Sequence, residues 1–168
     1  LCCQSDIPII YLQNITGYMV GTDAEQGGIV KHGSKMIQAV ANATVPQITI
    51  VMGGSFGAGN YGMCGRGFDP DFIFAWPNSR TAVMGGEQAA RVMSIVTEAK
   101  FAQRGQEVPK EFLEQMEQQI IDKFNEQSHP FNGTARLWDD GIIDPRDTRR
   151  VLAYTLSVCR DRRRRAVY

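Results

Sequence analysis

Apolar residues form short runs in the first half of the chain and recur at helical spacing in the second half. Each short run is bounded by glycine, proline or asparagine, which is the pattern of buried strands. The first run also enters a loop at Asn14–Gly21. The pattern predicts strands at Ile7–Gln13, Gln47–Met52 and Phe72–Trp76, with a fourth short apolar piece at Thr81–Met84.

Between the first two predicted strands, apolar residues at intervals of three and four predict a helix. It would begin at Thr22 or Asp23, whose side-chain oxygens suit an N-cap, and run to about Ala43. Its apolar face holds Ile29, Gly33, Met36, Ile37 and Val40. A glycine inside a helix costs about 1 kcal/mol. Gly33 on that face therefore predicts the close approach of another element.

Later elements are predicted to be mainly helical. The sequence predicts a short helix at Asn60–Cys64, a helix from Gly85-Gly86 to about Lys100, an irregular segment at His129–Asp140, and a last helix with Pro145 in its first turn. A helix is also predicted at Lys110–Asn125, and its inward face would hold Phe112, Leu113, Met116, Ile120 and Phe124. The inward face of the last helix would hold Val151, Leu152, Thr155, Leu156 and Cys159. Early alternation of strands and helices predicts a single α/β domain with helices packed around a sheet.

Composition adds few constraints. The 168 residues fit one domain, and the 18 basic residues balance the 18 acidic ones, so charge gives no reason to expect nucleic acid or an anionic membrane as partner. No apolar run approaches membrane-spanning length, and no signal peptide is evident. The arginine-rich run at residues 160–165 favours a solvated helix end, with an acidic partner as the alternative.

The cysteines predict thiols in a reducing compartment, because Cys2, Cys3, Cys64 and Cys159 form no C-x-x-C pair and no metal-ligand spacing. Only His32 and His129 could add ligands, so no metal site is expected. The chain begins Leu-Cys-Cys-Gln and enters a predicted strand almost at once. We therefore expect it to be a piece of a longer polypeptide.

The segment Gly53–Gly62 contains five glycines in ten residues and directly follows the predicted strand Gln47–Met52. Glycines let the chain turn sharply and approach a ligand closely. With few large side chains, such a turn offers mainly its peptide N–H groups, which stabilise an oxygen that is or becomes negative. Ala58 and Gly59, at the start of the next helix, are the expected donors.

Three other interpretations of this segment stay open. Gly57–Gly62 matches the dinucleotide pattern G-x-G-x-x-G, although Gly65, Gly67 and Pro70 would cut its helix short and no acid follows the next strand. Gly53–Gly57 matches the nucleophile pattern G-x-S-x-G, with His129 downstream. The third interpretation is a glycine turn that only allows close packing.

Six segments together carry a resemblance to a known family. They are Gln13–Gly21, Gly27–Met36, Gly53–Gly65, Ala75–Arg80, Val83–Ala90 and Trp138–Arg149. In these segments the chain resembles the carboxyltransferase (β) subunits of biotin-dependent acyl-CoA carboxylases. The segments are most similar to the 3-methylcrotonyl-CoA branch, with the geranyl-CoA branch close by. The resemblance covers the C-terminal half of such a subunit.

The resemblance implies a crotonase-like (ClpP-type) ββα superhelix, with residues 1–168 forming a C-terminal carboxyltransferase domain. It implies carboxyl transfer from carboxybiotin, held on a carrier domain, to an acyl-CoA, most simply 3-methylcrotonyl-CoA in leucine degradation. Geranyl-CoA or propionyl-CoA carboxylase, and a non-catalytic module for oligomerisation or carrier docking, are the alternatives. Implied partners are a biotin-carrying α subunit and further β subunits. The implied compartment is the bacterial cytoplasm or the mitochondrial matrix.

The resemblance also assigns residues. Ala58 and Gly59, with Gly57 beside them, are similar to the N–H pair that receives the biotin ureido oxygen. Tyr61 would shape the acyl pocket, and the N–H groups of Gly85 and Gly86 could contact substrate. Gly17 and Tyr18 would line the same cleft. For each of these a purely structural role is the alternative. Trp76 is expected to pack and His32 to lie at the surface or at a subunit contact, and no catalytic side chain is assigned because biotin can supply the base.

Overall fold

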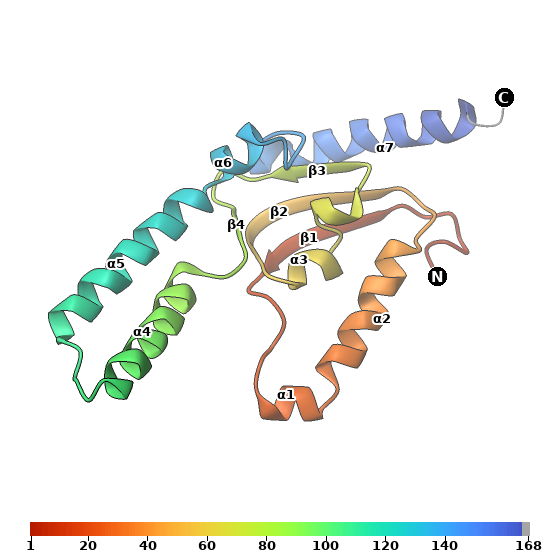
Figure 1. The fold of residues 1–168 in the computed structure, drawn as a ribbon. Helices are drawn as coiled ribbons and strands as arrows, with labels where there is room; N and C mark the ends of the chain where they lie inside the picture. Colours follow the sequence, from red (N-terminus) through yellow and green to blue (C-terminus); the bar gives the residue numbers. More distant parts are fainter. Residues whose placement is uncertain (166–168) are drawn as a thin grey trace.

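The chain folds around a parallel four-stranded sheet with helices on both faces (Figure 1). The computed structural model describes residues 1–165, with the side chains of residues 163–165 excepted. The central strand β2 pairs with all three others. The strands are β1 (Ile9–Ile15), β2 (Gln47–Phe56), β3 (Phe72–Ala75) and β4 (Arg80–Ala82).

Helices cover both faces of the sheet, and one pair of helices extends beyond it. The helices are α1 (Thr22–Gln26), α2 (Ile29–Ala41), α3 (Gly59–Gly62), α4 (Gly86–Gln103), α5 (Lys110–Gln127), α6 (Pro130–Ala135) and α7 (Thr148–Arg165), with single 3₁₀ turns η1 (Arg66–Phe68) and η2 (Pro145–Asp147). The antiparallel pair α4 and α5 extends away from the sheet, while α2 and α7 lie on opposite sides of it (Figure 1). The arginine-rich run ends α7, and its side chains at 163–165 lie outside the described residues.

The core lies between β2, β3 and α7. Ile48, Ile50 and Phe74 are buried there, and the partly buried residues packed on them are Met52, Phe72, Trp76, Ile143, Val151, Leu152 and Leu156. Because strand side chains alternate between faces, the odd-numbered residues of β2 face α2 and α3 instead. The predicted inward face of the last helix is confirmed. Trp76 packs as expected and donates from Nε1 to Thr148 Oγ1 at 3.0 Å.

Three predictions about the helices are wrong. The helix predicted from Thr22 to Ala43 is broken at Gly28, whose φ of +84° ends the helical path, and neither Thr22 nor Asp23 caps it, because Gly21 takes that place. The segment predicted as irregular contains α6, which His129 caps by accepting a hydrogen bond from the Phe131 N–H at 3.4 Å. Pro145 begins η2 rather than α7.

The first strand is at the sheet edge and is not buried as predicted. Ile10 pairs in register with Ile48 and so shares the face that α7 packs on, but Ile10 and Leu12 remain 40% and 48% exposed. By contrast, the close approach predicted at Gly33 is confirmed, since a Cβ there would lie 3.2 Å from the Tyr18 ring. Within residues 1–165 no helix is long and apolar enough to cross a membrane.

Candidate functional site

Strand β2 continues through the first glycines, so the glycine turn begins at Gly57 and not at Gly53 as predicted. Gln13 of β1 pairs with Val51, but Ile15 pairs with Ser55, so β2 carries two extra residues at this point. Such bulges re-aim side chains and are common next to active sites. Glycine is needed because a Cβ at Gly53 would collide with the Asn14 side chain, whose Oδ1 accepts from the Gly54 N–H at 3.0 Å.

The turn after β2 is fixed at both ends. Gly57 has a φ of +59°, which favours glycine, and its N–H donates to the Ala82 carbonyl at 3.1 Å. Gly59 lies against the loop that follows β1, because a Cβ there would be 3.0 Å from Ile15 Cδ1 and 3.2 Å from Gly17 Cα. The structure therefore brings together Gly17, Gly57 and Gly59, three of the predicted site residues.

The two predicted donors have no hydrogen-bond partner. Within residues 1–165 neither the Ala58 nor the Gly59 N–H donates a hydrogen bond, whereas those of Asn60 and Tyr61 donate to the carbonyls of Gly57 and Ala58 at 3.2 and 3.1 Å. Unpaired N–H groups are expected in the first turn of a helix. Ala58 is exposed, and Gly59 is buried.

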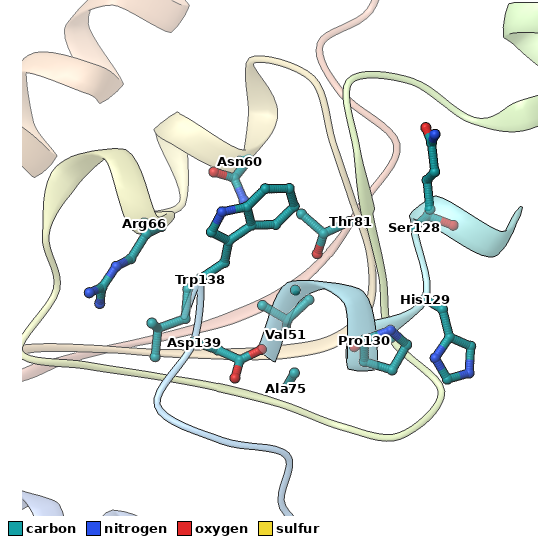
Figure 2. Close-up of a pocket in the computed structure, with 14 residues that line it drawn as sticks. Val51, Asn60, Arg66, Ala75, Thr81, Ser128, His129, Pro130, Trp138 and Asp139 are labelled. Carbon is teal, nitrogen blue, oxygen red and sulfur yellow. The ribbon is translucent and has the colours of Figure 1, made fainter. Parts of the chain in front are cut away.

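A cavity of about 350 Å³ adjoins this turn, and Gly57, Ala58 and Tyr61 line it. Its opposite side comes from the end of β4 and from Trp138. Asn60, Thr81 and Trp138 also line a smaller cavity of about 100 Å³ that reaches toward Asp139. Figure 2 shows the Trp138 indole beside Asn60 and Thr81 in that smaller cavity. The arrangement can hold a ligand with a largely apolar ring next to the hydrogen-bond donors of the turn.

A buried polar network lies beneath the turn. The Ser55 hydroxyl donates to Gln13 Oε1 at 2.6 Å, and Asn60 Nδ2 donates to Ser55 Oγ at 2.7 Å. Gln13 Nε2 donates to the Met63 carbonyl at 2.7 Å. Gln13 and Ser55 are both 0% exposed.

Two alternative interpretations of the glycine segment are wrong. Ser55 lies inside β2 and is bound to Gln13 and Asn60, while His129 caps α6, so no serine nucleophile and histidine base are paired. The dinucleotide pattern needs a full crossover helix, but α3 has only four residues.

The remaining predicted site residues differ in whether they line the cavity. Tyr61 lines the cavity and packs edge-on against Phe68 at 5.9 Å. Tyr18 instead packs against Gly33 and Gly62, where its buried hydroxyl has no partner among the described residues. Gly86 packs against Phe124 of α5, and neither it nor Gly85 is among the residues lining the cavity. Substrate contacts by Tyr18, Gly85 and Gly86 stay predictions.

Strongly shifted pKa values belong to groups that do not line the cavity. Burial raises the pKa of Cys64 to about 11 and that of Tyr11 to about 12. A hydrogen bond from Arg146 lowers the pKa of Asp144 to about 2. Within residues 1–165 no cluster of histidine, cysteine and acidic side chains is arranged to hold a metal.

Sequence reasoning did not assign Thr81, Val83 and Trp138 to the site, although all three line the cavity. Trp138 is more than 70 positions from the glycine turn, so no local spacing connects them. Its large aromatic ring in a polar segment was the available signal. The indole is 48% exposed, and the Arg136 guanidinium lies 5.6 Å from its centre.

The sequence matches the family described as carboxyl transferase domain over residues 1–168. It is 53% identical over 156 residues to the probable mitochondrial methylcrotonoyl-CoA carboxylase beta chain of Drosophila melanogaster, covering 93% of this chain and 27% of that protein. It is 52% identical over 159 residues to the biotin-dependent 3-methylcrotonyl-coenzyme A carboxylase beta1 subunit of Mycobacterium tuberculosis, covering 95% of this chain and 30% of that one.

Among solved structures, the chain is similar to the geranyl-CoA carboxylase beta subunit of P. aeruginosa. The TM-score is 0.87 at 59% sequence identity, covering 94% of this chain and 29% of that one. The chain thus spans less than a third of the length of these relatives.

Proposed function

This chain belongs to the carboxyl transferase domain family, and we propose that it forms the biotin-facing part of an acyl-CoA carboxylase. The reaction proposed is carboxyl transfer from carboxybiotin to an acyl-CoA, with 3-methylcrotonyl-CoA as the acceptor. Two relatives more than 50% identical carry methylcrotonyl names, and one name includes biotin dependence. Geranyl-CoA is the second candidate acceptor, because the similar solved structure is that of a geranyl-CoA carboxylase.

The proposed fold type is the crotonase-like ββα superhelix. The TM-score of 0.87 to a carboxylase subunit supports this assignment. The parallel pairing of β1, β2 and β3, with α2 between the first two, is compatible with it. Residues 1–168 would form the C-terminal carboxyltransferase domain of a longer β subunit.

The observation that carries the proposal is the pair of unpartnered N–H groups at Ala58, which lines a cavity of about 350 Å³, and at the adjoining Gly59. The bicyclic head of biotin is uncharged and mostly apolar, with one polar ureido edge. The apolar side chains of Tyr61, Val83 and Trp138 suit such rings, and the backbone donors suit the ureido oxygen. The residues present therefore fit the group.

When bound, carboxybiotin would supply the carboxyl group and present a ureido oxygen that carries negative charge during transfer. In this proposal the Ala58 and Gly59 N–H groups stabilise that charge by hydrogen bonds. Removing one preorganised donor of this kind costs about 3 kcal/mol in barrier. Gly57 holds the turn that orients both donors.

We further propose that the chain acts with a biotin-carrying α subunit and with other β subunits. The names of the relatives, beta chain and beta1 subunit, support a multi-subunit enzyme. The mitochondrial name of the Drosophila protein supports the mitochondrial matrix for a eukaryotic source. The cytoplasm is proposed for a bacterial source.

The test distorts the turn in the complete β subunit, assembled with its biotin-carrying subunit. Gly57→Val cannot adopt φ +59° without strain and would press its Cβ to 3.2 Å from the Val83 carbonyl. We expect it, like Gly59→Pro, to abolish carboxyl transfer from carboxybiotin while the subunits still assemble. Transfer is measured with 3-methylcrotonyl-, geranyl- and propionyl-CoA.

Gly105→Val is the matched control, because Gly105 has a φ of +69° but a Cβ at that position would have no atom within 4 Å. It should suffer similar backbone strain and keep transfer. Normal transfer by Gly57→Val would refute the N–H assignment. Normal assembly without transfer to any acyl-CoA by the unmodified enzyme would favour the docking module.

A further inference from the structure

The bulge in β2 has a specific result: it places Ser55 beside Gln13 on one face of the sheet. Gln13 is in register with Val51, four residues before Ser55. Regular pairing would set Ile15 opposite Gly53, yet it lies opposite Ser55, and the Ser55 hydroxyl reaches Gln13 Oε1 at 2.6 Å. Gly53 and Gly54 occupy the bulge, where the Asn14 side chain fills the space that a side chain at Gly53 would need.

From this point three hydrogen bonds reach α3, two at its beginning and one at its end, and the longest joins Gln13 Nε2 to the Asn60 carbonyl at 3.5 Å. Asn60, in the first turn of α3, donates from Nδ2 to Ser55 Oγ at 2.7 Å. Met63, just past the last turn, accepts at its carbonyl from Gln13 Nε2 at 2.7 Å. The four-residue helix is thus attached to the sheet through Gln13 and Ser55 at both its beginning and its end.

A helix this short cannot hold its place by its own backbone hydrogen bonds, because nucleating a single turn is unfavourable. The first and last positions of α3 contribute no side chain of their own, since both are glycine. Buried polar groups destabilise a fold unless they are hydrogen-bonded, and a fully bonded network fixes one geometry. Gln13 and Ser55, both 0% exposed, meet this condition.

We propose that Gln13 and Ser55 are positioning residues that set the orientation of the Ala58 and Gly59 N–H groups through α3. The inference rests on the proposed function, because it assigns those N–H groups their role. Gln13 lines neither of the two cavities near the turn, so it would act only through Ser55 and α3, whereas Ser55 also lines the larger cavity. A misplacement of about 1 Å far from the reacting atoms can cost on the order of 100-fold in rate.

The experiment uses two variants of the complete enzyme. Gln13→Met keeps the length of the side chain and removes its hydrogen bonds to Ser55, Asn60 and Met63. Ser55→Ala removes the hydroxyl with little change in volume. We expect each to lower kcat for carboxyl transfer by about 10- to 100-fold, as for a small misplacement of the donors. KM for the acyl-CoA should stay unchanged, and Ser55→Thr, which keeps the hydroxyl, should restore most of the rate.

A second measurement does not depend on activity. Hydrogen–deuterium exchange, read by mass spectrometry, should be faster in residues 57–63 of Gln13→Met and Ser55→Ala than in the unmodified protein. The matched control is Thr49→Val. Thr49 is also 0% exposed on the same face of β2, and its hydroxyl donates to the Cys64 carbonyl at 2.7 Å, beyond α3. It should lower stability similarly and leave both kcat and exchange of residues 57–63 unchanged.

The possible outcomes distinguish the positioning role of Gln13 and Ser55 from the proposed function. Normal kcat and normal exchange in Gln13→Met and Ser55→Ala would overturn the positioning role while leaving the proposed function in place. Equal loss of kcat in Thr49→Val would overturn it too, because the effect would then be general destabilisation. If the unmodified enzyme transfers no carboxyl group, the proposed function fails. In that case, unchanged hydrogen–deuterium exchange in Gln13→Met and Ser55→Ala would independently overturn the role of these two residues in fixing α3. If Gln13→Met does not fold, the smaller change Ser55→Ala decides by the same criteria.

Discussion

At the scale of single residues, the glycines around the site meet different physical requirements. Gly53 leaves room for the Asn14 side chain, Gly57 takes a φ of +59°, and Gly59 lets α3 lie against Gly17. Only the requirement at Gly57 concerns backbone conformation, whereas the other two concern space. Substitutions should therefore act differently: a β-branched residue at Gly57 strains the turn, and any side chain at Gly59 pushes α3 away from the loop after β1.

The cysteine thiols carry a residue-scale prediction on pH. The thiolate is the reactive form of cysteine. The Thr44 N–H donates to Cys3 Sγ at 3.4 Å and lowers the pKa of that exposed thiol, whereas burial raises the pKa of Cys64 to about 11. A lowered pKa leaves more thiolate at neutral pH, and a raised one leaves less. We expect iodoacetamide to modify Cys3 well before Cys64, as read by mass spectrometry of timed samples.

Modification in urea provides the control. Unfolding removes both the hydrogen bond to Cys3 and the burial of Cys64, so the modification rates of the two thiols should become similar. Raising the pH toward 9 should leave the modification of Cys64 slow, since its pKa is about 11. Equal rates for Cys3 and Cys64 in the folded protein at neutral pH would contradict the burial of Cys64.

At the scale of elements, the α4–α5 hairpin depends on close packing at its base. A Cβ at Gly86 would lie 3.2 Å from Phe124 Cβ and 3.3 Å from the Ile121 carbonyl. Gly86→Val should therefore push α4 away from α5 and lower the free energy of unfolding by about 1–3 kcal/mol, as overpacking does. Urea unfolding followed by circular dichroism measures the loss.

The neighbouring glycine is the matched control. A Cβ at Gly85 would meet only Gln88 Oε1, at 4.0 Å, and the φ of Gly85 is −66°, which any residue adopts. Gly85→Val should thus cost much less stability than Gly86→Val. If both cost the same, the glycine pair serves the start of α4 and not its contact with α5.

At the scale of the whole molecule, large apolar side chains stay exposed on several elements, among them β1 and α4. Ile10 and Leu12 lie on the uncovered part of the sheet, and Val92 and Val96 lie one turn apart on α4, 51% and 40% exposed. Contiguous exposed apolar surface promotes association in soluble proteins. We expect the isolated chain to bind a hydrophobic dye and to elute above its monomer mass of 18.7 kDa in size-exclusion chromatography.

Charged substitutions on these elements identify which exposed surface causes the dye binding and the association. Val92→Lys combined with Val96→Lys should lower dye binding and shift elution toward the monomer. Val20→Lys is the control, because Val20 is 88% exposed but belongs to neither element, since it lies in the loop after β1. A dye-free monomer before any substitution would contradict this prediction.

The sequence by itself determined the elements whose local pattern is strong. Apolar runs located the strands β2 and β3, and helical spacing located α4, α5 and the inward face of α7. The six segments also indicated the carboxyltransferase resemblance, which the family match confirms. These features depend on residues close together in sequence, where periodicity records which side of each element is buried.

Only the tertiary structure decided the bulge in β2, the exposure of β1 and the surroundings of the glycine turn. The bulge depends on the register between two strands, and the exposure of Ile10 depends on which elements α7 covers. Gln13 and Ser55 are 42 positions apart, and Trp138 is farther still from Ala58. Local periodicity carries no information on such pairings, because long-range contacts form only when separate elements pack together.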